Sequence, residues 1–178
     1  MEHTHAIVMR RHRLTETSLI VHWIAPGLGR FKTVVKGALR PRNPLGAVLD
    51  LFHKCEVQFQ RARSGELHAL REAVLLESFP GVRTAWNRVG LAAYAVELLE
   101  RATERETPVP ELYDLLERAL GFLNAQPASL RALHHFEAEL ARILGIAEPA
   151  CPSSTVLERW LHGLPPGRET LLARIHSG

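Results

Sequence analysis

The sequence has little of what a secreted or membrane-spanning protein needs. Its 178 residues include two cysteines, Cys55 and Cys151, which are far apart and form no Cys-x-x-Cys pair. This scarcity favours a reducing compartment with two free thiols over one long-range disulfide. No apolar run approaches the roughly 18 residues of a membrane-spanning helix. The start, Met-Glu-His-Thr-His, also lacks the order of a secretory signal. We therefore expect a cytoplasmic globular protein.

Motifs for catalysis and metal binding are equally scarce. The sequence contains no Gly-x-Ser-x-Gly, no phosphate-binding glycine loop and no His-Glu-x-x-His. Among the ten histidines, His134 and His135 are adjacent. On a helix they would point about 100° apart and could not chelate from one face. Glu97 and Glu100 lie beside Arg101, which favours ion pairing on a solvated helix face over acid–base chemistry. We expect no enzyme, no cofactor and no metal site.

Positive charge is concentrated near the beginning of the chain. Residues 1–79 carry a net charge of +5, whereas residues 80–178 carry −2. Before residue 49 the only acids are Glu2 and Glu16, against eight cations: Arg10, Arg11, Arg13, Arg30, Lys32, Lys36, Arg40 and Arg42. Such a cation density suits a polyanion better than a small substrate, so these eight are the candidate DNA-binding residues. The alternative is a solvated basic face on a protein with an isoelectric point near 9.2.

The first 79 residues have the pattern of short β-strands. We expect strands at 6–9, 19–24, 30–36, 56–60 and 67–76, separated by glycine-containing turns and one long loop after the third strand. In the third strand Arg30, Lys32 and Lys36 share one face, with apolar residues behind them. Five strands and one long loop predict an OB-type barrel over residues 1–79.

Aromatic residues are few in this half, and the phase of most of them favours the core: Trp23, Phe31, Phe52, Phe59 and Phe79. Few aromatic side chains are then left to stack on bases. We therefore predict binding to the phosphate backbone that tolerates many sequences.

From Pro80 onward the apolar period is helical. Helices are expected at 82–99, 112–123 and 130–144, with Gly145 as a C-terminal cap. Shorter helices are expected at 156–161 and 169–175. The predicted class is α+β: a five-stranded OB-type barrel followed by a C-terminal helical bundle over residues 80–178.

Several segments form a recognisable order along the chain: residues 6–21 with Glu-Thr-Ser, Gly29–Arg30, residues 34–40 with Lys-Gly-Ala-x-Arg, and residues 67–73, 92–98 and 135–145. Together these segments span about residues 5–147. In this order they resemble RecO, the family of bacterial recombination mediators.

The resemblance implies an N-terminal OB-fold, a helical C-terminal domain and no covalent chemistry. It also implies binding of single- and double-stranded DNA, annealing of complementary strands and cooperation with RecR. Single-strand-binding protein and RecA are further implied partners, at a nucleoid-associated cytoplasmic location. The resemblance carries over four of the candidate residues by position: Arg10, Arg30, Lys36 and Arg40. The other four rest on the strand and loop pattern alone: Arg11, Arg13, Lys32 and Arg42.

Two departures from the family pattern bear on the helical half. Many members carry a four-cysteine zinc element after the Leu-Gly that matches Leu144–Gly145, but here that region has only Cys151. We expect the zinc element to be lost and the helical domain to be shortened, which leaves docking of the acidic tail of single-strand-binding protein open. The alternative hypothesis is a helical protein-interaction adaptor with only minor DNA binding and a basic rim from Arg83, Arg88 or Arg131.

Overall fold

The computed structural model describes residues 1–176 and confirms the α+β class. Contacts divide the chain into two compact units, one of residues 1–78 with 104–113 and one of 79–103 with the residues from 114 onward. The sequence suggested residues 107–110 only as a break between two helices. The structure groups the whole segment 104–113 with the strands, and we call it the connecting segment.

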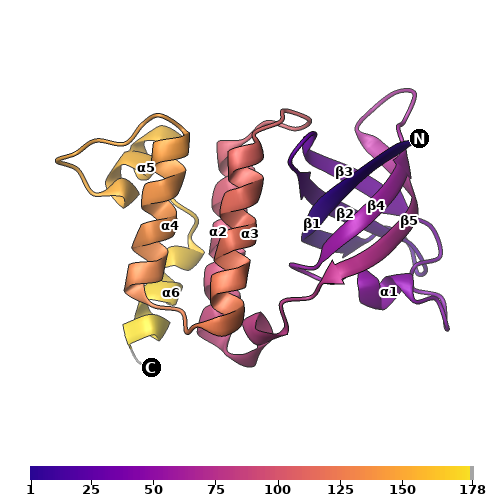
Figure 1. Cartoon of the computed structure of the whole chain (residues 1–178), viewed down its shortest axis with the longest axis horizontal. Coiled ribbons are helices and arrows are strands. Elements are labelled where there is room, and N and C mark those ends of the chain that lie inside the picture. The colour runs from indigo at the N-terminus through magenta and orange to yellow at the C-terminus, as the bar shows by residue number, and fades with distance from the viewer. Residues whose placement is uncertain (177–178) are drawn as a thin grey trace. The chain divides into compact units, whose positions relative to one another are not determined.

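The first unit is a closed barrel with the strand order β1-β2-β3-β5-β4 (Figure 1). Its strands are β1 (Glu2–Arg13), β2 (Leu19–Ala25), β3 (Gly29–Val35), β4 (Lys54–Gln60) and β5 (Leu67–Glu77). All neighbours are antiparallel except β3 and β5, which run parallel. Closure leaves little unpaired strand edge, which protects a small sheet from pairing with other chains.

The barrel interior is apolar and aromatic. All five aromatic residues of the chain's first 79 residues are buried, each at most 6% exposed. Trp23, Phe31 and Phe59 belong to the barrel core, whereas Phe79 falls in the second unit. Phe31 stacks on Phe59 at a centroid distance of 4.9 Å, and His68 stacks on the same Phe59 ring at 5.4 Å. The indole N–H of Trp23 donates to Thr33 Oγ1 at 2.8 Å, so its buried polar atom is satisfied.

The first strand is longer than the sequence predicted. Expected over residues 6–9, it runs from Glu2 to Arg13. Only residues 6–9 of this strand are buried, and they are the apolar run from which the sequence predicted a strand. The flanking polar residues are strand because their backbone pairs with β4 and β2, with a register shift between Val8 and Arg10.

The long loop between β3 and β4 contains a four-residue helix, α1 (Leu45–Val48). The Asn43 side chain organises the approach to it, donating to the Gly37 carbonyl at 2.8 Å and accepting from the Leu45 amide at 3.0 Å. The Leu39 amide donates to the Thr17 carbonyl at 2.9 Å. This loop is therefore ordered by local bonds and joined to the β1–β2 turn.

The second unit is helical. It contains a short 3-10 helix η1 (Pro80–Thr84), then α2 (Trp86–Ala102), α4 (Leu130–Ile143), α5 (Ser153–Leu161) and α6 (Gly167–His176), and α3 (Pro110–Ala125) contributes from residue 114 onward. Val82, predicted as the start of the first helix, lies in η1 because Ala85 is extended at φ −150° and interrupts the helix. Gly145 follows α4 at φ +71°, as the cap prediction requires. No helix within residues 1–176 is long and apolar enough to cross a membrane.

A buried polar cluster ties α6 into this unit. Glu137 of α4 is 1% exposed, and its carboxylate lies 2.7 Å from Nε of Arg168. The Tyr94 hydroxyl of α2 donates to the same carboxylate at 2.7 Å. The Glu137 carboxylate raises the pKa of Arg168, and burial raises the pKa of Tyr94. Glu137 is thus a buried charge with two partners, which is what its burial requires.

Candidate nucleic-acid interface

The third strand places two of its three predicted cations outward, Arg30 and Lys32, whereas Lys36 lies just beyond its last residue, Val35. Along β3 every second residue is buried, with Phe31 and Val35 each 2% exposed and Thr33 fully covered. Arg30 and Lys32 occupy the alternate, partly exposed positions. A strand with this alternation presents one face to the barrel core and its cations to the opposite side.

Strand register builds a row of three basic side chains across the barrel wall. Arg10 of β1 lies opposite His22 of β2, and His22 lies opposite Lys32 of β3. Directly opposed residues in antiparallel strands have Cβ atoms about 5 Å apart and point to the same side. We call Arg10, His22 and Lys32 the basic row. His22 was not among the predicted residues, because only the register reveals its place.

The charge state of His22 reflects this surrounding. Its pKa falls from 6.5 to about 4, first because burial disfavours the charged ring and then because of nearby positive charge. The contributing groups are Lys32, His12, Arg10 and Arg105. His12 also contacts His22 edge to face at a centroid distance of 5.2 Å. The basic row therefore places a cation on each side of an imidazole that is neutral at pH 7.

Other predicted cations gather at the end of the barrel where β1 finishes. Arg13 pairs with Leu19, which pairs with Val35, and Lys36 follows directly. Arg40 and Arg42 lie in the adjoining loop, and all four side chains are exposed. The Thr17–Leu39 backbone bond holds this loop against the β1–β2 turn. We call these four residues the basic end: Arg13, Lys36, Arg40 and Arg42.

The Arg11 guanidinium is bonded within the barrel unit. It lies 3.0 Å from the Asp50 carboxylate and donates to the carbonyls of Gly46 and Leu49 at 3.1 and 3.3 Å. These contacts join β1 to the α1 region. The structure thus gives Arg11 a structural role, while its contact with DNA stays a prediction.

The outer face is not exposed along its whole length. Ile7 and Ile24 are directly paired and share the outward side with Arg30. Both are buried, at 0% and 2% exposure. This part of the face is therefore covered, whereas the part that carries the basic row and the basic end beyond it is partly or fully exposed.

The helical unit carries a separate apolar groove. It has a volume of about 500 Å³ and is lined by residues of α2, α3 and α4, among them Phe122 and Phe136. Phe122 is 45% exposed there. Arg131 lines the groove together with Arg118 and His135. Arg88, also predicted as rim, instead donates to the carbonyls of Gly81, Leu123 and Asn124, and Arg83 is not among the lining residues.

Cysteine chemistry is limited in the described part of the chain. Both thiols are free, as predicted: Cys55 is buried and Cys151 partly exposed. Burial raises the pKa of Cys55 to about 12, so this thiol stays protonated at neutral pH.

Within residues 1–176, no three His, Cys, Asp or Glu side chains lie close enough together to hold a metal ion.

Comparison with known proteins assigns both units. Residues 1–79 match the family described as Recombination protein O N terminal, and residues 83–148 match Recombination protein O C terminal. A DNA repair protein RecO from Rhodopirellula baltica is 32% identical over 154 residues, which cover 86% of this chain and 57% of that protein. Another from Pelobacter propionicus is 36% identical over 117 residues, covering 66% and 47%. The chain spans about half the length of these curated relatives. On these matches, and on its barrel followed by helices, the chain belongs to the RecO family.

Proposed function

We propose that this chain acts in DNA repair and recombination by binding nucleic acid through the phosphates, at the basic row and the basic end. The observation that carries the proposal is the register that aligns Arg10, His22 and Lys32 on one side of the barrel. Its support is the membership of the RecO family, whose named relatives are DNA repair proteins. Lys and Arg on phosphates gain free energy by releasing counterions, whatever the base sequence.

The composition of the face determines the kind of binding. The five aromatic residues of the chain's first 79 residues are buried, so this barrel offers none of them as a stacking platform. Binding without stacking depends on the backbone that single and double strands share. The proposed activity is therefore the holding of single- and double-stranded DNA and the annealing of complementary strands, without covalent chemistry. The proposed partners are RecR, single-strand-binding protein and RecA, in the nucleoid-associated cytoplasm.

The test is annealing of two complementary oligonucleotides coated with single-strand-binding protein, with and without RecR. We expect annealing by the wild-type chain and its loss in Lys36→Glu, because Lys36 is exposed at the basic end. Arg142→Gln on α4 is the control, since it removes one exposed cation far along the sequence from the barrel. Equal annealing rates in wild type, Lys36→Glu and a protein-free reaction would contradict the proposal.

The groove of the helical unit supports a second candidate function, that of a protein-interaction adaptor. Its apolar lining and its basic residues Arg118 and Arg131 suit a peptide that is both acidic and apolar. The acidic tail of single-strand-binding protein is the peptide to test. Binding of a labelled tail peptide should weaken in Phe122→Ala and Arg131→Glu and remain in Lys36→Glu. If the peptide binds neither the wild-type chain nor Lys36→Glu, the adaptor function is contradicted.

A further inference from the structure

The connecting segment completes the barrel wall beside β3. On one edge β3 pairs with β2 along its whole length, but on the other edge it pairs with β5 only from Lys32 to Val34. Next to Arg30, where β5 has not yet begun, the partner is Arg105, in a parallel bridge. The Glu106 amide donates to the Arg30 carbonyl at 2.8 Å.

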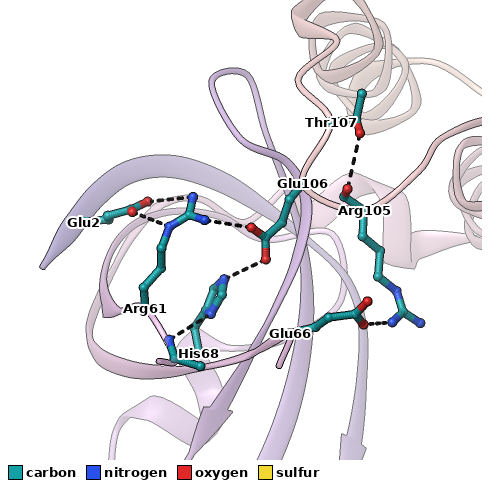
Figure 2. Close-up of polar contacts among 8 residues, drawn as sticks. Glu2, Arg61, Glu66, His68, Arg105, Glu106 and Thr107 are labelled. Atoms are coloured by element: carbon teal, nitrogen blue, oxygen red, sulfur yellow. Dashed lines mark hydrogen bonds and ion pairs between the residues drawn. The ribbon is translucent and has the colours of Figure 1, made fainter. Parts of the chain in front are cut away.

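Polar side-chain contacts of Arg105 and Glu106 also fix the connecting segment to the barrel. Figure 2 shows the Glu106 carboxylate between Arg61 and His68. The Arg61 guanidinium lies 2.8 Å from it, and His68 Nε2 approaches to 3.1 Å without the alignment of a directed hydrogen bond. Arg61 is also paired with Glu2, so two carboxylates already occupy its guanidinium. Arg61 therefore has little capacity left for an outside anion.

Arg105 is differently placed. Its side chain is 45% exposed, and it is one of the cations that depress the pKa of His22. Its charge thus acts on the centre of the basic row, although Arg105 comes from the link between α2 and α3. The carboxylate that neutralises it is Glu66, which is 56% exposed at the β4–β5 turn (Figure 2). An exposed pair of this kind contributes little to stability, so a polyanion can replace the carboxylate.

We propose that Arg105 is a further phosphate contact of the DNA-binding face, and that Glu66 is its internal competitor. The proposal rests on the proposed function and adds two elements to it. The binding face is made of three strands together with the connecting segment, and one carboxylate of the barrel occupies a phosphate position until DNA displaces it. A guanidinium suits this exchange because its planar fork binds carboxylate and phosphate oxygens in the same geometry.

The experiment is fluorescence anisotropy of labelled single-stranded DNA with the full chain, in a salt series from about 50 to 200 mM. Arg105→Gln should weaken binding about threefold or more at low salt and make the log–log salt slope shallower by about 0.7, the value for one phosphate contact on a single strand. Arg105→Lys should keep most of the slope. Glu66→Gln should raise the affinity. Arg142→Gln is the control, because it also removes an exposed arginine paired with a carboxylate.

The double variant separates competition from a general change in charge. If Glu66 acts through Arg105, the gain from Glu66→Gln shrinks when Arg105 is already Gln. An undiminished gain would overturn the competitor role. Equal slopes for Arg105→Gln and Arg142→Gln, with wild type still binding, would overturn the Arg105 contact and leave the proposed function standing. Absence of wild-type binding would instead contradict the proposed function itself. Circular dichroism of each variant checks that the fold is kept.

Discussion

His22 lies directly opposite Lys32 in the β2–β3 pair, and the charge of Lys32 is one cause of the low pKa of His22, about 4. In the unfolded chain a histidine titrates near 6.5. Between these values the unfolded chain binds a proton that the folded chain does not. The contribution of the neutral His22 side chain to the free energy of unfolding is therefore fully present above about pH 6.5, and it is lost as the pH falls toward 4.

We predict that His22→Gln reduces this loss of stability. The measurement is the thermal midpoint of each protein at neutral pH and near pH 5. The difference between the two midpoints should be smaller in His22→Gln than in wild type, while His134→Gln, at an exposed histidine of α4, serves as the control. The side chain is only half buried, so solvent screening makes the effect modest. An identical pH dependence in wild type and His22→Gln would show that burial and the neighbouring cations do not lower the pKa of His22 in the folded chain.

Arg11 and Arg13 lie two residues apart on β1 but should respond differently to loss of charge. Arg11→Gln removes the Asp50 ion pair and two bonds to carbonyls, so we expect a loss of about 1 kcal/mol in the free energy of unfolding. Arg13→Gln should stay within about 0.5 kcal/mol of wild type, and it should lower DNA affinity. Urea denaturation and anisotropy measure the two effects. The opposite pattern would place Arg11 in the DNA contact and remove it from the α1 junction.

Gly29 controls how closely the connecting segment approaches β3. Its φ is +72°, and a Cβ there would lie 2.2 Å from the Thr107 carbonyl oxygen. Gly29→Ala should therefore displace the segment and destabilise the barrel by more than about 1 kcal/mol. Hydrogen exchange of the Glu106 amide, which bonds to Arg30, should become faster. Gly27→Ala in the same turn has nothing within 4 Å and is the matched control. Unchanged exchange in Gly29→Ala would contradict this packing.

Two glutamates on α4 provide a matched pair for the helical unit. Glu137→Gln leaves the mostly buried Arg168 without its counter-charge, which should cost about 3 kcal/mol. Glu139→Gln breaks an ion pair to Arg142, whose side chain is 63% exposed, and should cost less than about 1 kcal/mol. Urea denaturation followed by circular dichroism compares them. Equal costs would show that Glu137 is not a buried partner of Arg168.

The sequence was sufficient for the barrel and for the direction of β3, because both follow from a period of two along a short segment. Alternation alone placed Arg30 and Lys32 outside and Phe31 inside. It could not place His22 between Arg10 and Lys32, since that depends on the register of two hairpins and on the shift after Val8.

Contacts between distant segments were also beyond the sequence. Arg105 reaches β3 from the link between two helices, and nothing in its neighbourhood along the chain indicates a strand partner. Arg11 looked equivalent to Arg13 until its bonds to Asp50 and the α1 region were visible. In both cases the partner is chosen by tertiary packing, which local pattern does not record.

Contact of the basic row with phosphates is tested most directly by the salt dependence of DNA binding by wild type and Lys32→Gln. Anisotropy should be recorded with labelled single and double strands of different sequences. We predict weaker binding of Lys32→Gln to all of them and a log–log salt slope shallower by about 0.7 to 0.9, the value for one lost phosphate contact. Wild-type affinity that does not change with salt, or a Lys32→Gln slope equal to that of wild type, would contradict contact of the basic row with phosphates.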